Sequence, residues 1–214
     1  MPSSPYQKQL DELLKNLAIT KKDGQTKPTL LLHACCGPCS SYVLEYLSQY
    51  FAITVFYYNP NIYPQEEYNR RLSELKTFYT KFAPAANVRV VEEVYNPEDF
   101  YTAIQIHEHP ERATEPEKGE RCRLCYKFRL QKVYEYAAAH NYDYYCTTLS
   151  ISPFKDAEKI NVLGTEIAKN SAPRWLPSDF KKHGGFQRSL ELSSEYGLYR
   201  QQYCGCIYSI HSAQ

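Results

Sequence analysis

Three cysteines within five residues, directly after a short apolar run, constrain the fold of this chain more than any other feature. The apolar run covers residues 29–34, and the cysteines are Cys35, Cys36 and Cys39. Residues 40–50 then place apolar side chains at the spacing of one helix face. The pattern predicts a buried strand, a tight turn that carries three thiols, and a helix.

Strand-like and helix-like segments alternate along the rest of the chain. Runs rich in β-branched and aromatic residues predict strands at 52–58, 88–94 and 144–148. Helices are expected at 66–82, 98–106, 120–140, 155–169 and 189–202. Strands separated by helices predict an α/β fold, with an open, mostly parallel, Rossmann-like sheet and helices on both faces. Such sheets bind ligands at the carboxyl ends of their strands, where Cys35 and Cys36 fall.

The chain divides at a polar linker near its N-terminus. Residues 1–27 comprise an amphipathic helix at 4–17 and a polar segment that contains Gly24. We expect this part to be an N-terminal helical extension of a single α/β catalytic domain at residues 28–214, which carries all eight cysteines.

The composition indicates how the cysteines are used. The sequence has neither an apolar segment long enough to span a membrane nor the apolar core of a signal peptide. We therefore expect a cytoplasmic protein without a membrane partner, in a compartment where eight cysteines are metal ligands or redox groups more often than disulfides. The net charge of +1 gives no overall field that would indicate nucleic acid.

A second cysteine pair, Cys122 and Cys125, falls at i and i+3 near the start of an expected helix, so both sulfurs lie on one face. With Cys35 and Cys36 they can form a shell of four thiolates, which suits tetrahedral zinc or an iron–sulfur cluster. Successive side chains in an extended segment point apart, which is awkward for one zinc ion. Adjacent cysteines can reach different irons of a wider cubane cluster, so the sequence favours the cluster.

Two other uses of these cysteines stay open. Cys36 and Cys39 with Cys122 and Cys125 form a CxxC…CxxC set that can bind zinc, although its central gap is far longer than in compact zinc ribbons. Cys36-Gly37-Pro38-Cys39 is also the thioredoxin active-site tetrapeptide, between a strand and a helix. A thioredoxin fold needs a further strand and helix ahead of that strand, and only a polar helix and a linker precede it here.

A third motif, Cys204-Gly205-Cys206, lies near the C-terminus. Two cysteines one residue apart can close only a small, strained disulfide ring, which is easily reduced and suits an electron relay better than a structural crosslink. Cys146 falls in an expected buried strand, and we expect it to be a small core residue.

Together these motifs resemble those of the QueH-type epoxyqueuosine reductases. The matching segments are, in chain order, LLLHACCGPCS, YYNPNIYPQEEYNRR, GERCRLCYKFRL, TTLSISPFKD and QQYCGCIYS. The resemblance implies reduction of the epoxide of epoxyqueuosine, a modified guanosine at the wobble position of certain tRNAs, to queuosine. It also implies tRNA as a partner and an electron donor that the sequence does not identify.

The resemblance implies a set of site residues as well. The ligands of a [4Fe-4S] cluster would be Cys35, Cys36, Cys122 and Cys125. The redox-active pair would be Cys204 and Cys206. An additional mononuclear iron is implied, for which Cys39 is a candidate ligand.

Aromatic and basic side chains are candidates for RNA contacts. An enzyme that acts on a base must take it out of its stack, and aromatic rings can stack the extruded base. We expect Tyr58 and Tyr68 to do so, and Arg71 and Arg121 to bind phosphates.

Other functions stay open beside the reductase. A metal-free thiol–disulfide oxidoreductase would use Cys36 and Cys39, and a zinc-stabilised tRNA-binding module would use the cysteines as ligands only. Among candidate proton donors, His33 lies in an expected strand and fits a core histidine, and Asp156 fits a helix cap.

Overall fold

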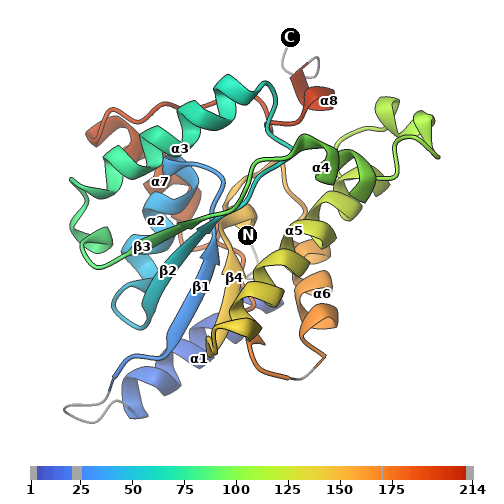
Figure 1. Cartoon of the computed structure of the whole chain (residues 1–214). Coiled ribbons are helices and arrows are strands. Elements are labelled where there is room, and N and C mark those ends of the chain that lie inside the picture. The colour runs from blue at the N-terminus through green and yellow to red at the C-terminus, as the bar shows by residue number, and fades with distance from the viewer. Residues whose placement is uncertain (1–3, 21–25, 170, 211–214) are drawn as a thin grey trace.

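A central sheet of parallel strands organises the fold (Figure 1). The computed structural model describes residues 4–20, 26–169 and 171–210. Within them the strands pair in parallel in the order β3-β2-β1-β4-β5. Their bounds are β1 Thr29–His33, β2 Ala52–Tyr57, β3 Arg89–Glu92, β4 Tyr144–Thr147 and β5 Arg174–Trp175. The predicted open, parallel α/β sheet is confirmed, and β1 lies at its centre.

Helices cover both faces of this sheet. Their bounds are α1 Pro5–Thr20, α2 Gly37–Leu47, α3 Gln65–Tyr79, α4 Pro97–Ala103, α5 Glu120–Ala139, α6 Ala157–Ala168, α7 Gly185–Glu195 and α8 Ile207–Ile210. Short 3-10 helices are η1 Ala83–Ala85, η2 Pro110–Thr114 and η3 Thr148–Ile151. On one face α1, α2, α3 and α7 share a core with Leu30 and Leu32, and on the other α5 and α6 pack with Leu31. Because successive strand side chains point to opposite faces, a strand covered on both faces is apolar throughout.

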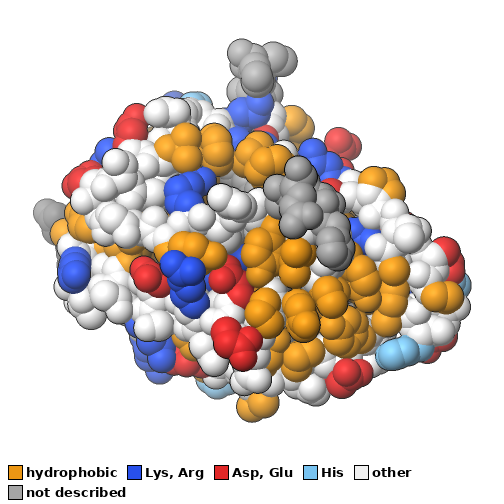
Figure 2. Space-filling view, turned by 90° about the horizontal axis from the view of Figure 1, so that it is seen from above, with side chains coloured by type: hydrophobic (Ala, Val, Ile, Leu, Met, Phe, Trp, Pro, Cys, Tyr) orange, Lys and Arg blue, Asp and Glu red, His pale blue; other side chains and the backbone are white. Residues whose placement is uncertain are grey.

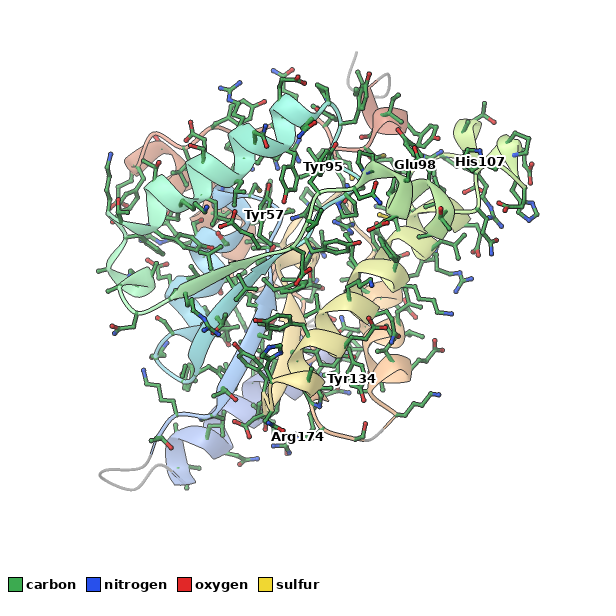
Figure 3. All side chains as sticks on the ribbon, viewed as in Figure 1. Tyr57, Tyr95, Glu98, His107, Tyr134 and Arg174 are labelled. Atoms are coloured by element: carbon green, nitrogen blue, oxygen red, sulfur yellow. The ribbon has the colours of Figure 1, made fainter. Side chains whose placement is uncertain are left out.

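The order of the strands reverses at β1. The chain passes from β1 to β2 and β3 on one side, then crosses to β4 and β5 on the other. Sheets of this kind bind ligands in the crevice at such a switch point, outside the carboxyl ends of the strands. His33 of β1 lies at this end, with Nδ1 2.8 Å from Thr147 Oγ1 of β4. Figure 3 shows Tyr95 and Glu98 at the carboxyl end of the sheet, whereas Arg174 lies at the opposite end.

Two short features near the ends of strands differ from the expected ones. α2 begins at Gly37 instead of residue 40, because the Cys36 side chain caps the helix, and Cys39 therefore lies inside it. β5 is an additional strand of two residues, in which Trp175 packs edge-on against Tyr145 of β4. A strand of that length has no periodic pattern to read.

The helix expected at 189–202 is wrong in its second half. α7 ends at Glu195, and Gly197 follows in the left-handed region with φ +61°. Residues 198–206 form neither helix nor strand. This irregular segment returns to the carboxyl edge of the sheet and carries the third cysteine motif.

The N-terminal helix α1 packs on the same core as the rest of the chain. Leu10 is fully buried and Leu14 is 3% exposed, and both belong to the core cluster that includes α2. Asp11 accepts a hydrogen bond from Tyr46 of α2 at 3.2 Å and pairs with His183 at 2.9 Å. The expected division of the chain after residue 27 stays a prediction. None of the helices in the described part of the chain is long and apolar enough to cross a membrane.

These contacts predict that α1 contributes to the stability of the whole domain. Leu10→Ala leaves a cavity under the helix and is expected to lower the free energy of unfolding by about 2–5 kcal/mol. Ile19→Ala, on the same helix but with a side chain that is 70% exposed, should change it by less than about 0.5 kcal/mol. Urea denaturation followed by circular dichroism measures both, and equal stabilities would show that α1 is a separate extension.

Candidate metal and redox site

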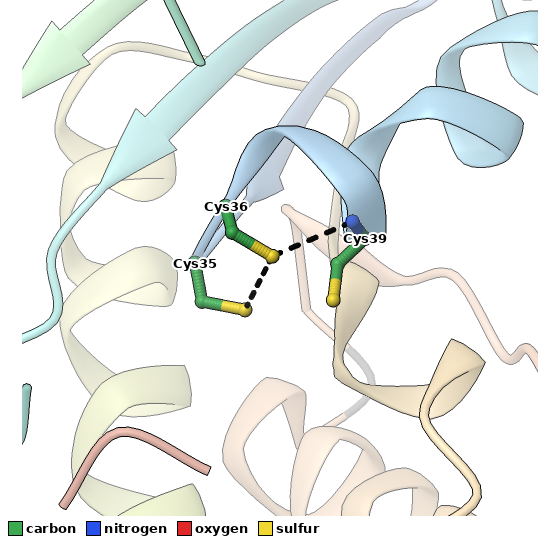
Figure 4. Close-up of side chains that lie close together, drawn as sticks. All are labelled: Cys35, Cys36 and Cys39. Carbon is green, nitrogen blue, oxygen red and sulfur yellow. Dashed lines mark hydrogen bonds between the residues drawn. The ribbon is translucent and has the colours of Figure 1, made fainter. Parts of the chain in front are cut away.

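The first turn of α2 gathers three sulfur atoms (Figure 4). The Sγ of Cys36 accepts the backbone N–H of Cys39 at 3.4 Å and the thiol of Cys35 at 3.9 Å. Gln201 Nε2 donates to the same sulfur at 3.2 Å. In the described part of the chain, Cys35, Cys36 and Cys39 are the one group of three or more potential metal ligands whose ligand atoms all lie within 4.8 Å. From the sequence Cys39 is only a candidate ligand of an additional iron, whereas the turn places its sulfur with those of Cys35 and Cys36.

Negative charge in this trio collects on Cys36. Hydrogen bonds from Cys35 and Cys39 lower the pKa of Cys36 well below its ordinary value, and the Arg71 guanidinium adds to the effect. The N-terminus of a helix favours an anion at the same place. The pKa of Cys35 is raised chiefly because its thiol donates to Cys36, and the pKa of Cys39 is raised because its thiol donates to Cys35 and Cys36. Metal ions displace thiol protons, so this turn is suited to bind one.

The first turns of α5 bring two more cysteines to this region. Cys122 packs against the apolar cluster that contains Cys35 and Cys36, and Cys125 packs in a cluster with Cys206. Burial raises the pKa of both the Cys122 and Cys125 thiols. Their spacing of three residues places them on one face of α5, as expected, and both line one small cavity.

The third motif supplies one thiolate and one thiol. Lys155 Nζ, on a side chain that is almost fully buried, donates to Cys204 Sγ at 2.5 Å. A hydrogen bond from Cys206 lowers the pKa of Cys204 well below its ordinary value against the effect of burial, and the Lys155 charge lowers it further. The pKa of Cys206 is raised, because its thiol donates that bond and is itself buried. Both cysteines are free of disulfides.

Two cavities meet at the third motif. The larger, about 300 Å³ in volume, is lined by Cys35, Cys39, Lys155 and Cys204 among others. The smaller is lined by Cys122, Cys125, Cys204 and Cys206. Cys204 is the one cysteine that lines both. Seen from above, this end of the molecule carries a broad patch of apolar side chains with Lys and Arg side chains beside it (Figure 2).

Three buried arginines lie around these sulfurs. Arg71, Arg121 and Arg129 are each at most 2% exposed. In each, one guanidinium nitrogen is buried without a hydrogen-bond partner among the described residues: Nη2 of Arg71 and Arg129, and Nε of Arg121. A buried donor without an acceptor is costly. Three such donors beside a set of thiols indicate that an anionic group belongs among them.

The two tyrosines expected to stack a base are packed in the core. Tyr58 is 4% exposed, and its hydroxyl donates to Asp99 at 2.9 Å. Tyr68 is 5% exposed and packs against Tyr57 and Tyr95. Neither lines the larger cavity. Their role in substrate binding stays a prediction that this geometry does not support, because aromatic rings close to a sheet are also its packing residues.

The two arginines expected to bind phosphates are also buried. Arg71 Nε donates to Glu67 Oε1 at 2.6 Å, and Arg121 Nη1 donates to the carbonyl oxygen of Arg112 at 2.5 Å. Neither guanidinium lines the larger cavity. Phosphate binding by them stays a prediction, and their positions suit an interior anion better than an RNA backbone.

Three residues have the structural roles that their sequence context indicated. His33 is fully buried, with its ring nitrogens within hydrogen-bond distance of Thr147 Oγ1 and the carbonyl of Tyr58. Asp156 caps α6 and accepts the backbone N–H of Lys159 at 3.1 Å. Cys146 is fully buried in β4, and burial raises its pKa to about 12.

Sequence reasoning missed three residues of the site: Lys155, Arg129 and Gln201. Lys155 belongs to the TTLSISPFKD segment, but it reads there as the first residue of an expected helix. Arg129 lies one turn beyond Cys125, whose backbone carbonyl accepts its Nε at 3.4 Å. The i+4 spacing was a usable signal for Arg129. No sequence signal indicates Gln201, because it lies in the irregular segment at residues 198–206.

Comparisons with known proteins agree with one another. A sequence model of the family described as "Epoxyqueuosine reductase QueH" matches residues 30–212. A protein named epoxyqueuosine reductase QueH from Streptococcus pyogenes is 40% identical over 96% of this chain and 80% of its own length. A Staphylococcus aureus protein of the same name is 40% identical over 93% of this chain and 82% of its length. One from Thermotoga maritima is 32% identical over 85% of this chain and 90% of its length.

Gly205 is expected to be essential for the geometry of the third motif. Its φ is +119°, and a Cβ there would lie 2.8 Å from Arg71 Nη1, in a guanidinium that Glu67 and the Cys204 carbonyl hold in place. Gly205→Ala should lower the free energy of unfolding by about 1–3 kcal/mol and reduce turnover sharply. Gly197→Ala has a positive φ but no neighbour within 4 Å, so it should cost about 1 kcal/mol and keep activity. Thermal unfolding and turnover assays test both, and equal turnover in the two variants would contradict the role of Gly205.

Proposed function

The chain belongs to the epoxyqueuosine reductase QueH family, and on this basis we propose that it reduces the epoxide of epoxyqueuosine at the wobble position of tRNA to queuosine. The observation that carries the proposal is that three chain segments bring seven cysteines to one end of the sheet, where all but Cys36 line two cavities. Conversion of the epoxide to an alkene consumes two electrons and two protons and releases water. A set of buried thiols beside a cavity is suited to supply them.

Four of these cysteines are the proposed ligands of an iron–sulfur cluster. We propose that Cys35, Cys36, Cys122 and Cys125 hold a [4Fe-4S] cluster, since such clusters are bound by four thiolates. The resulting group is anionic, and the three unpartnered arginine nitrogens supply N–H donors for it. When bound, the cluster supplies one-electron transfer beside the cavity. Cys39, within 4.8 Å of the Cys35 and Cys36 sulfurs, is the proposed ligand of an additional mononuclear iron.

The Cys204–Cys206 pair is proposed to supply the two electrons. Joining the Cys204 thiolate and the Cys206 thiol in a disulfide releases two electrons and one proton. The epoxide oxygen needs two protons to leave as water, so one more must come from the site. An external electron donor then reduces the disulfide for the next turnover.

Lys155 is proposed to supply the second proton. Burial lowers the pKa of its ammonium, but the charge of the Cys204 thiolate outweighs this and raises the pKa above its ordinary value. When Cys204 is oxidised, that charge disappears, and a buried ammonium without a counter-ion releases its proton readily. The protons from Lys155 and Cys206 then balance the two electrons and form water with the epoxide oxygen.

One observation favours a second function, thiol–disulfide exchange by Cys36 and Cys39. The lowered pKa of Cys36 at a helix N-terminus, with Cys39 close by, is typical of dithiol oxidoreductases. That function has no use for Cys122 and Cys125, which separates it from the reductase.

Three cysteine variants test the proposed cofactor. Protein purified without oxygen should contain about four irons or more and acid-labile sulfide. Cys122→Ala should lose iron and activity together, Cys204→Ala should keep iron and lose turnover, and the core control Cys146→Ala should keep both. Iron and sulfide analysis and mass spectrometry of tRNA nucleosides measure these outcomes. A protein with one zinc, or a Cys122→Ala variant with full activity, would contradict the proposal.

Replacement of Lys155 should separate chemistry from cofactor binding. Lys155→Met removes the cation beside Cys204, and turnover should fall by about 100-fold or more with the iron content unchanged. The rate at which Cys204 is alkylated reports its thiolate, which the cation stabilises. Lys155→Arg keeps the charge and should restore this rate. It should not restore turnover, because arginine holds its proton too tightly to release it. Full turnover by Lys155→Met would contradict its role as a proton source.

A further inference from the structure

The larger cavity has a buried end and an open end. Cys35, Lys155 and Cys204 line it beside the redox motif, and Cys35 and Lys155 are at most 8% exposed. Phe154 and Glu117 line the same cavity but lie nearer solvent, since Phe154 is 66% exposed and Glu117 is partly exposed. A volume of about 300 Å³ is sufficient for one nucleobase with a small substituent.

Phe154 lines the same cavity as the redox sulfur of Cys204. It precedes Lys155, whose Nζ donates to Cys204. The short loop is fixed by Ser152, which accepts the Phe154 N–H through its side chain at 3.3 Å and the Lys155 N–H through its carbonyl at 3.1 Å. An exposed aromatic ring on a loop whose backbone is fixed can stack a base without rearrangement of the loop.

Glu117 offers the cavity a carboxylate with unused acceptors. It makes no hydrogen bond or ion pair with any residue in the described part of the chain, and it is near enough to Lys155 to contribute to that residue's raised pKa. The carboxylate is therefore close to the redox end of the cavity as well as to its mouth. An ionised carboxylate accepts hydrogen bonds only, with two oxygens side by side.

Among the four bases, guanine matches this arrangement. Its Watson–Crick edge carries two adjacent donors, the ring N–H and the exocyclic amine, whereas adenine, cytosine and uracil each carry only one donor group on that edge. Enzymes that act on an extruded base read its Watson–Crick edge and stack its face.

We propose that the mouth of this cavity is the base-reading site, where Phe154 stacks an extruded guanine-type base and the Glu117 carboxylate accepts hydrogen bonds from its Watson–Crick edge. The proposal rests on the proposed function and adds the residues that select the base. It also replaces Tyr58 and Tyr68 as the stacking residues by one that the cavity exposes.

The test measures binding of an anticodon stem-loop RNA with guanosine at the wobble position, and of the same RNA with inosine there. Inosine lacks the exocyclic amine and is otherwise the same base. The full-length, cluster-loaded wild-type protein should bind the guanosine RNA about tenfold more tightly, since one hydrogen bond to a carboxylate is lost with inosine. Glu117→Gln should bind both RNAs with similar affinity.

Phe154 is tested with the same two RNAs. Phe154→Ala should weaken the binding of both by about tenfold and keep the preference for guanosine, because stacking is insensitive to the edge of the base. Phe154→Tyr should restore the affinity, which a purely structural effect of the alanine variant would not predict. Matched controls are Glu135→Gln on α5 and Val162→Ala on α6, both outside the cavity, and both should bind like wild type.

Two results would overturn the proposal. One is a ratio of the affinities for the guanosine and inosine RNAs that is the same in wild type and in Glu117→Gln, including the case in which wild type binds both equally. The other is unchanged affinity in Phe154→Ala. Neither RNA contains an epoxide and no reductant is added, so the binding test does not depend on reductase activity. If the protein distinguishes the two RNAs but does not reduce epoxyqueuosine, the base-reading site is supported and the proposed reductase function is contradicted.

Discussion

The site depends on the pairing of buried sulfur charge with buried cations. Cys36 and Cys204 have lowered pKa values, and each lies beside a buried cation, Arg71 for the first and Lys155 for the second. A buried charge is costly unless it is paired, so each thiolate is stabilised by its cation; among the described residues Lys155 is paired with Cys204 alone, whereas Arg71 is also paired with Glu67. The cations come from α3 and from the loop before α6, so this pairing connects both halves of the sheet to the cysteines.

The same pairing explains how an irregular segment is held over the carboxyl edge of the sheet. Residues 198–206 have no helix or strand hydrogen bonds of their own. They are fixed instead by Arg71 to the Cys204 carbonyl, by Lys155 to the Cys204 sulfur, and by the Tyr63 N–H to the Gly205 carbonyl at 2.8 Å. The third motif is therefore positioned by contacts from distant elements, and its geometry depends on the rest of the site.

Sequence patterns predicted what local rules determine. The apolar run before Cys35 and the i, i+3 spacing of Cys122 and Cys125 are set within one element, and the structure has them as expected. The exposure of Arg71 and the partner of Lys155 are set by tertiary packing, which composition and local spacing do not predict. A basic residue in a tRNA-modifying family suggests a phosphate contact, yet Arg71 is 1% exposed. It pairs with Glu67 four residues earlier, as helical spacing allows, but the other charge near it is the Cys36 sulfur 35 positions away, which no spacing rule connects to it.

The position of Cys204 between the two cavities limits how electrons can reach a substrate. The proposed cluster ligands divide between the two cavities, since Cys122 and Cys125 line the smaller one and Cys35 lines the larger one. Cys35 and Cys39 line only the larger cavity and Cys206 only the smaller, whereas Cys204 lines both. A relay has to exchange electrons with both sides, and Cys204 is the cysteine in a position to do so. Its sulfur is also the one that accepts a hydrogen bond from Lys155, so the proposed sources of the electrons and of the proton are adjacent atoms.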